Sequence, residues 1–378
     1  MRQPAHGGNL AWAAALAGCP PDAILDFSAS ISPLGPPNSA IAAIQSQIGN
    51  LKHYPDPNYS ELRLALSHFH QLPPEWILPG NGSAELLTLA GRELAQLAAV
   101  MLITPAFGDY YRTLAAYNAK VLECPLMSSE QRVLSFELPV LLSTQREVGA
   151  EVSSAPNFGD SALNTHCGLL LNNPHNPTGK LFSRESILPY LEQFALVVVD
   201  EAFMDFVPPD EEQSLISVVQ EYANLVILRS LTKFYSLPGL RLGYAIAHPD
   251  RLAKWQLWRD PWPVNTLAAA AAIAAIQDTE FQQQTWTWLP PARSQLFQGL
   301  TSISGLHPQE SAVNFLLVES KQATSQLQQQ LLKHHQILIR DCLSFKELGD
   351  RFFRVAIRSE SDNQRLLKAL QSVLSAEC

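Results

Sequence analysis

Several residues with chemically reactive or anion-binding side chains lie close to Lys233 in the sequence. This lysine ends the run SLTK at residues 230–233, and Arg241 follows shortly after it. A lysine on its own is usually a solvated surface charge. The hydroxyls of Ser230 and Thr232, together with the Arg241 guanidinium, form a set that suits a phosphate dianion. The sequence therefore predicts an amine next to a site for a small anion.

A second predicted anion-binding element is the glycine-rich run LPGNGSAE at residues 78–85, which precedes a helix-like stretch that ends near Leu97. Glycines let the backbone approach a ligand closely, and the free N–H groups at the start of a helix attract phosphate. Glu85 stands where a dinucleotide fingerprint has its third small residue. The run therefore favours a small anion over a dinucleotide.

Two more polar segments follow predicted strands. NNPHNPTG at residues 172–179 is rich in turn formers and by itself predicts only a turn. Asp200 ends the apolar run 196–199 and begins the motif DEAF. A carboxylate at a buried strand end needs a partner, because an unpaired buried charge is very unfavourable. A protonated ring nitrogen would serve as that partner.

The elements that must position these residues have the pattern of a mainly parallel α/β sheet. Between residues 75 and 250, short apolar runs alternate with longer helix-like stretches. Ligands of such sheets bind beyond the carboxyl ends of the strands, so we expect the polar segments to converge on one site. The predicted strands are residues 100–104, 168–171, 196–199, 226–228 and 244–247.

The chain is expected to form a large domain and a smaller α+β domain. After Pro263 the sequence changes to helical stretches, and it ends with a predicted strand at 351–357 and a helix at 362–374. Residues 127–166 are polar and are predicted to form a surface excursion. The predicted divisions are an N-terminal segment 1–37 that packs with the small domain, a large domain 38–265 and a small C-terminal domain 266–378.

Composition and charge exclude several classes of protein. Apolar residues make up 47% of the 378 positions and the net charge is −9, which fits a globular protein and argues against nucleic-acid binding. The longest apolar run, 267–276, is shorter than the ~20 residues that span a membrane. The run 10–18 is preceded by HGGN, so no secretory signal is expected. Five scattered cysteines without a C-x-x-C pair indicate reduced thiols in a cytoplasmic protein, and no metal site is predicted.

Several motifs together resemble a known enzyme family. NPHNPTG, DEAF and SLTKFYSLPGLRLG (residues 230–243) are similar to segments of the fold-type I pyridoxal-phosphate enzymes related to aspartate aminotransferase. Within that group, HGGN (6–9), LDFSASISPLGPP (25–37), HYPDPNY (53–59) and FFRVAIRS (352–359) resemble the threonine-phosphate decarboxylases of cobalamin biosynthesis. The resemblance covers nearly the whole chain. It implies that the chain has the fold of the fold-type I enzymes and that its cofactor is pyridoxal 5′-phosphate.

The resemblance also implies roles at the cofactor. Lys233 would bind the cofactor aldehyde as a Schiff base, Asp200 would pair with the pyridine nitrogen, and Asn176 would hydrogen-bond the ring hydroxyl oxygen. Phe107 would stack on the pyridine face. The cofactor phosphate would be held by Ser230, Thr232, Arg241 and the backbone of Gly82 and Ser83.

At the substrate, the resemblance implies that Arg354 binds the carboxylate and that Arg340 and His6 lie near the phosphate of a phosphorylated amino acid. Tyr54 would reach the cofactor phosphate of a neighbouring subunit. A homodimer with shared active sites follows from that role.

Some residues depart from the family pattern. Phe203 stands where many related aminotransferases have a tyrosine, so no second hydroxyl contacts the cofactor ring oxygen from this position. Ser30 and Ser32 stand where the decarboxylases usually have asparagines, which leaves the substrate contacts of that loop open. The excursion at 140–164 is longer than in that family.

The expected reaction is decarboxylation of L-threonine O-3-phosphate to (R)-1-aminopropan-2-yl phosphate. A histidinol-phosphate aminotransferase, or another amino-acid aminotransferase, is the alternative, since it would have the same fold and cofactor residues. A regulator that only senses the cofactor is disfavoured, because no basic helix-turn-helix extension precedes the fold.

Overall fold

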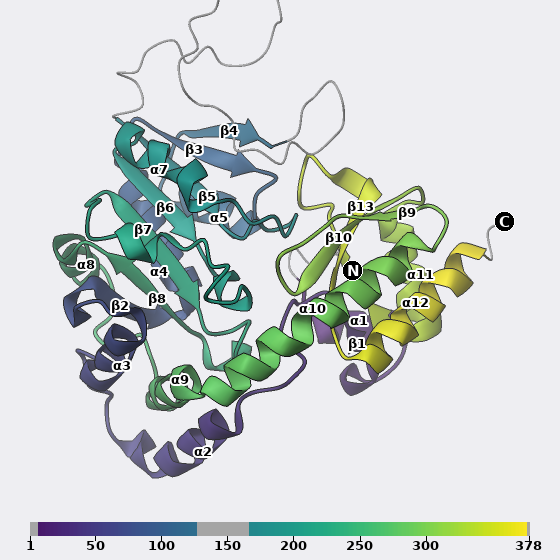
Figure 1. Cartoon of the computed structure of the whole chain (residues 1–378), viewed down its shortest axis with the longest axis horizontal. Coiled ribbons are helices and arrows are strands. Elements are labelled where there is room, and N and C mark those ends of the chain that lie inside the picture. The colour runs from purple at the N-terminus through teal and green to yellow at the C-terminus, as the bar shows by residue number, and fades with distance from the viewer. Residues whose placement is uncertain (1–6, 127–165, 376–378) are drawn as a thin grey trace, which may run out of the picture.

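A seven-stranded sheet forms the centre of the larger of two domains (Figure 1). The computed structural model describes residues 7–126 and 166–375. Neighbouring strands are parallel except at β8, which is antiparallel to both β2 and β7, so the predicted mainly parallel sheet is confirmed. In spatial order the strands are β2 (Ile77–Asn81), β8 (Leu242–Ala247), β7 (Leu225–Ser230), β6 (Leu196–Asp200), β5 (Cys167–Asn172), β3 (Ala99–Thr104) and β4 (Val121–Pro125).

The strands are apolar on both sides because helices cover both faces of the sheet. Val197 and Val199 of β6 belong to one hydrophobic core, whereas Val198 between them belongs to a second core on the opposite face. The helices whose residues enter the first core include α3 (Ser60–His70), α7 (Arg184–Gln193) and α9 (Thr266–Gln277), and those of the second include α4 (Gly82–Leu94), α5 (Gly108–Ala116) and α8 (Pro249–Gln256).

Strand β2 was not among the predicted strands. Pro79 and Gly80 lie within it, and both residue types weaken a strand pattern. The structure places β2 at the edge of the sheet, where a proline is tolerated. The glycine-rich run 78–85 thus forms the end of a strand and the first turn of α4.

The smaller domain is built on an antiparallel sheet in the order β12 (Arg340–Asp341), β13 (Phe352–Ala356), β10 (Phe315–Ser320) and β9 (Leu306–Pro308). It also contains α11 (Thr324–His335) and α12 (Glu360–Ser375). Near the N-terminus, α1 (Leu10–Ala17) packs against α11, and β1 (Leu25–Asp26) pairs with β11 (Ile337–Leu338). The predicted smaller α+β domain is therefore confirmed.

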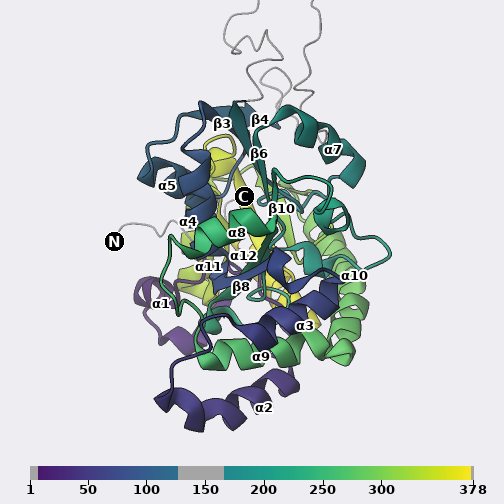
Figure 2. The same cartoon turned by 90° about the vertical axis from the view of Figure 1, so that its left-hand side faces the viewer.

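Two helices connect the domains. The apolar run 267–276 lies in α9, which packs against α3 and against α2 (Asn38–Gln47) below the large sheet (Figure 2). The 23-residue helix α10 (Thr279–Thr301) then runs to the small domain, where it contacts α12 and β9. Because α9 packs against helices of the predicted large domain, the division at residue 265 stays a prediction.

Two expectations concern segments near the chain surface. The apolar run 10–18 is part of the fold, since Ala13 and Ala14 of α1 are buried in a cluster with Leu332 and Leu338. Within residues 7–126 and 166–375, no helix combines the length and the hydropathy that a membrane crossing requires. The predicted excursion 127–166 lies almost wholly outside the described residues.

The contact between β8 and the first turn of α4 gives a test of the fold. A Cβ added at Gly243 would lie 2.5 Å from the backbone nitrogen of Ser83 and 2.6 Å from the backbone oxygen of Arg229. We expect Gly243→Ala to lower the free energy of unfolding by about 1–3 kcal/mol, because backbone atoms cannot move aside cheaply. Urea denaturation measures the change. Gly239→Ala is the control, since nothing lies within 4 Å of its Cβ; equal stability of the two variants would contradict the prediction.

Candidate active site

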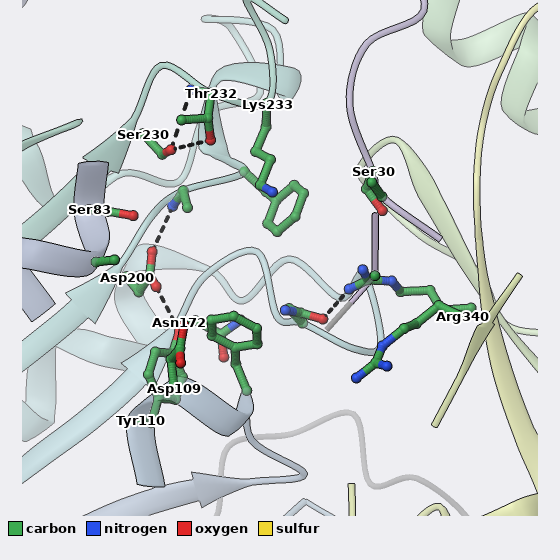
Figure 3. A pocket seen from close by; sticks show the side chains of 18 of the residues that line it. Ser30, Ser83, Asp109, Tyr110, Asn172, Asp200, Ser230, Thr232, Lys233 and Arg340 are labelled. Atoms are coloured by element: carbon green, nitrogen blue, oxygen red, sulfur yellow. Dashed lines mark hydrogen bonds between the residues drawn. The ribbon is translucent and has the colours of Figure 1, made fainter. Parts of the chain in front are cut away.

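One cavity collects most of the predicted site residues. It lies beyond the carboxyl ends of β5, β6 and β7 and is closed on the other side by the small domain and the N-terminal segment (Figure 3). The predicted residues that line it are Ser83, Phe107, Asn176, Asp200, Ser230, Thr232, Lys233, Arg241, Arg340 and Arg354. The expected convergence at the strand ends is therefore found.

Lys233 projects into this cavity from the turn after β7 (Figure 3). Its backbone oxygen accepts a hydrogen bond of 3.0 Å from the N–H of Ser32, so the N-terminal loop holds the turn in place. Burial, together with the positive charges of Arg354 and Arg241, lowers the pKa of Lys233 to about 8, and the charge of Asp200 opposes this shift. The amine is therefore available in its neutral, nucleophilic form near physiological pH.

The groups around Ser230 form a cradle for an anion. Ser230 Oγ lies 2.8 Å from Thr232 Oγ1, and Ser83 lies on the same side of the cavity at the start of α4 (Figure 3). Gly82, with φ of +73°, is the first residue of that helix, and a Cβ there would lie 2.7 Å from Nη2 of Arg241. A side chain at Gly82 would thus displace the guanidinium. Hydroxyls, a guanidinium and a helix N-terminus together fit a phosphate dianion.

Asp200 lies at the end of β6 and carries two hydrogen bonds. Tyr110 Oη donates to Oδ2 at 2.8 Å, and the N–H of Ala202 donates to Oδ1 at 3.0 Å. Burial raises the pKa of Asp200, whereas these hydrogen bonds and the nearby Lys233 charge lower it. A protonated pyridine nitrogen would stabilise the ionised carboxylate, so this position fits the predicted contact with the cofactor ring.

The two predicted substrate arginines lie on neighbouring strands of the small domain. Arg340 of β12 pairs in register with Arg354 of β13, and both line the cavity. Arg354 Nη1 donates to Asn176 Oδ1, and its guanidinium lies 4.6 Å from the centre of the Phe315 ring. Burial and the charge of Arg340 lower the pKa of Arg354 to about 10. An anionic ligand would relieve both effects.

Arg340 is held by a different contact. Its Nη2 donates a hydrogen bond of 2.8 Å to Ser344 Oγ, and only 7% of the residue is exposed. Arg354, by comparison, has a buried Nε without a hydrogen-bond partner among the described residues. Figure 3 shows Arg340 on the side of the cavity opposite Ser230 and Thr232. The cavity therefore has cationic groups on two sides, which suits two separate anions.

Two predicted residues, Tyr54 and His6, are not placed in this arrangement. Tyr54 does not line the cavity; the residue is 79% exposed, and its ring centre lies 4.5 Å from that of Trp262. His6 lies outside the described residues. Phe203 lines the cavity and packs edge-on against Phe315, so the position without a hydroxyl faces the site as expected. The roles of Tyr54 and His6 stay predictions.

The sequence did not predict a role for several groups that line the cavity. One of them is Tyr110, although its spacing of one helical turn from Phe107 places both residues on one side of α5. Ser30 is 1% exposed, its hydroxyl has no hydrogen-bond partner among the described residues, and it faces the cavity on the side of Arg340 (Figure 3). Gly7 approaches Ser28 so closely that a Cβ would lie 2.3 Å from its backbone oxygen. No local pattern signals such contacts.

Comparisons with known proteins agree with this geometry. The family model described as aminotransferase class I and II matches residues 22–370. Threonine-phosphate decarboxylase from Salmonella typhimurium is 36% identical over 98% of this chain and 97% of that protein. The chain belongs to the class I and II aminotransferase family.

Proteins named for a different activity are also similar to the chain. Histidinol-phosphate aminotransferase from Symbiobacterium thermophilum is 31% identical over 91% of this chain and 88% of that protein. The crystal structure of histidinol-phosphate aminotransferase from Clostridium acetobutylicum has a TM-score of 0.79 at 27% identity, covering 93% of this chain and 100% of that chain. As a member of this family, the present chain uses pyridoxal 5′-phosphate as its cofactor. The anion cradle fits the cofactor phosphate, Asp200 fits the ring nitrogen, and Lys233 fits the aldehyde.

The lowered pKa of Lys233 predicts how the apoprotein reacts with the cofactor. Only the neutral amine attacks an aldehyde, so the rate of Schiff-base formation should rise with pH. The midpoint of this rise should lie at about pH 8, whereas an ordinary lysine, with a pKa of ~10.4, would give a midpoint near that value. Stopped-flow visible absorbance after addition of pyridoxal 5′-phosphate measures this rate. Arg354→Met serves as the comparison: loss of a nearby cation should move the midpoint to higher pH. A midpoint near that of an ordinary lysine in both proteins would contradict the assignment.

Proposed function

We propose that this enzyme releases CO2 from L-threonine O-3-phosphate and forms (R)-1-aminopropan-2-yl phosphate. The observation that carries the proposal is the pair Arg340 and Arg354, which lines the same cavity as Lys233 in a chain similar to a threonine-phosphate decarboxylase. The reaction balances because one proton replaces the departing CO2 at Cα. A place in cobalamin biosynthesis goes with this substrate.

The substrate carries two anionic groups, and the cavity offers a cation for each. Arg354 binds the carboxylate through N–H groups at the edge of its guanidinium other than the one that donates to Asn176. Arg340 and His6 bind the phosphate, and on the same side as Arg340 lies the hydroxyl of Ser30, which has no hydrogen-bond partner within residues 7–126 and 166–375. A planar guanidinium suits both kinds of anion. Fixing both ends of the substrate sets which bond at Cα is aligned to break.

Bound pyridoxal 5′-phosphate supplies an electron sink for the charge released at Cα. Asp200, held by Tyr110 and Ala202, keeps the ring nitrogen protonated. Lys233, whose pKa of about 8 lies near the working range, would hold the proton that replaces CO2 at Cα and would donate it there. The protein would select decarboxylation through the orientation in which Arg354 and Arg340 hold the substrate.

Amino transfer from a phosphorylated amino acid is the alternative function. The relative from Symbiobacterium thermophilum is named a histidinol-phosphate aminotransferase, and the cofactor residues would serve either reaction. The two reactions differ in whether a proton or the carboxylate leaves Cα. Decarboxylation is favoured because the named decarboxylase has the higher identity and the longer coverage.

The substrate assignment is tested with purified enzyme and threonine phosphate, with and without a 2-oxo acid. We expect CO2 and aminopropanol phosphate in equal amounts without the 2-oxo acid, measured by CO2 release and mass spectrometry. Lys233→Ala should retain the fold by circular dichroism and lose turnover. Arg354→Gln should raise KM by about tenfold or more, since a charged hydrogen bond to the substrate is lost. Product formation only with a 2-oxo acid would establish amino transfer instead.

We further propose a cytoplasmic homodimer in which Tyr54 contacts the cofactor phosphate of the other subunit. An exposed tyrosine and a neighbouring tryptophan that is 45% exposed support an interface at this surface. Tyr54 lies outside the cavity of its own chain, as the shared site requires.

Mixing two inactive variants tests the shared site. Lys233→Ala and Tyr54→Ala should each lose activity; after joint unfolding and refolding at equal amounts, about a quarter of the parental activity should return, because each mixed dimer has one intact site. Analytical ultracentrifugation establishes that the proteins are dimers. If Tyr54 served its own subunit, no intact site would form, and activity would stay at the sum of the two variants.

A further inference from the structure

A buried charged cluster lies behind the cavity and takes no part in the steps proposed above. Arg229 is 2% exposed and contacts three carboxylates. Its Nη1 lies 2.6 Å from Asp205 Oδ1, its Nη2 lies 2.6 Å from Glu212 Oε1, and its Nε lies 3.1 Å from Glu201 Oε2. Ser214 Oγ donates to Glu201 Oε2 at 2.6 Å. We call these five residues the Arg229 cluster.

The cluster joins the two strand ends that carry the site. Glu201 directly follows Asp200 at the end of β6, and Arg229 directly precedes Ser230 at the end of β7. The ion pair between them therefore links the backbone at the carboxylate for the ring nitrogen to the backbone at the anion cradle. The N–H of Glu201 also donates to the backbone oxygen of Leu228 at 2.8 Å. A shift of either strand end would be transmitted to the other.

The cluster also fixes the chain that leaves β6. The N–H of Leu215 donates to Glu201 Oε1 at 2.9 Å, which ties the start of the segment 201–215 to its end. Ala202 and Phe203, within this segment, line the cavity. Trp286 of α10 donates its indole N–H to the backbone oxygen of Asp205 at 2.9 Å. One wall of the cavity is thus held by the cluster and by the helix that connects the domains.

We propose that the Arg229 cluster is a positioning device for the cofactor site: it fixes Asp200 relative to Ser230 and holds the wall formed by Ala202 and Phe203. Its residues do not touch the reacting atoms. The inference rests on the proposed function only in that both require bound pyridoxal 5′-phosphate. It applies equally to decarboxylation and to amino transfer.

The carboxylates of the cluster depend on the charge of Arg229. Three carboxylates face one guanidinium, and burial raises the pKa of Glu201 to about 7 and that of Asp205 to about 6, while Arg229 opposes both shifts. The other titratable groups that face Arg229 are Tyr235, Tyr244 and His70, each with burial disfavouring its charged form. Loss of the guanidinium would leave buried carboxylates unpaired, which is strongly destabilising. Variants of Arg229 itself are therefore poor tests.

Glu201→Gln is the sharper test, because the amide keeps the shape of the carboxylate and removes its charge. Glu93→Gln is the control: Glu93 forms a largely buried ion pair with Arg251 in the same domain, with both side chains 15% exposed, and it does not line the cavity. We expect both variants to fold and to show small decreases in thermal midpoint. Only Glu201→Gln should weaken pyridoxal 5′-phosphate binding, by about tenfold or more, since small displacements of positioned groups have large effects.

Cofactor affinity is measured by titrating apoprotein and following visible absorbance, and steady-state kinetics then separate kcat from KM. A positioning role predicts a lower kcat at saturating cofactor with little change in substrate KM. Unchanged cofactor affinity and kcat in folded Glu201→Gln would overturn the proposal.

Glu212→Gln provides a second test in case Glu201→Gln does not fold. The Glu212 side chain is 31% exposed, and Arg229 keeps its contacts with Asp205 and Glu201 when Glu212 is replaced. The Glu212→Gln variant should weaken cofactor binding in the same direction by a smaller factor. If Glu201→Gln does not fold, unchanged cofactor affinity in Glu212→Gln overturns the proposal. Affinity is measured without substrate, so a failure of the decarboxylase assignment leaves this readout intact.

Discussion

Buried charges that depend on one another at the carboxyl edge of the large sheet determine how the rest of the site is built. Burial raises the pKa of Asp200 and lowers those of Lys233 and Arg354, so each group is disfavoured in its charged form when alone. A cofactor with a ring nitrogen and a phosphate, and a substrate with two anionic groups, provide the missing partners. Binding of these ligands therefore stabilises charged groups that burial in the folded protein disfavours.

Two kinds of sheet supply the two halves of the site. The parallel strands β5, β6 and β7 end at one edge and bring the cofactor residues together, as strand ends do in open α/β sheets. The antiparallel small-domain sheet brings Arg340 beside Arg354 through its register. The N-terminal loop completes the enclosure by hydrogen-bonding the backbone of Lys233. The residues proposed to hold the cofactor and the two arginines proposed to bind the substrate thus lie in different domains.

The fold and the reaction are separate questions in this family. Members named as decarboxylases and as aminotransferases are similar to the chain over most of its length. The groups that hold the cofactor can serve both reactions, because the cofactor provides the same electron sink in each. We propose that the choice between them depends on how Arg340 and Arg354 hold the substrate, and product analysis distinguishes the two reactions.

The sequence by itself determined the features that depend on local order along the chain. Apolar runs followed by polar turns placed Asp200 and Lys233 after buried strands, because strand ends and turns are encoded by neighbouring residues. The pattern did not predict the antiparallel direction of β8, the edge strand β2 with its proline, or the hydrogen bond from Tyr110 to Asp200. The pairing of Arg229 with Glu201 was equally hidden. Only the tertiary structure decided these features. They depend on contacts between residues that are separated in the sequence, and the spacing of those residues follows neither a helical nor a strand period.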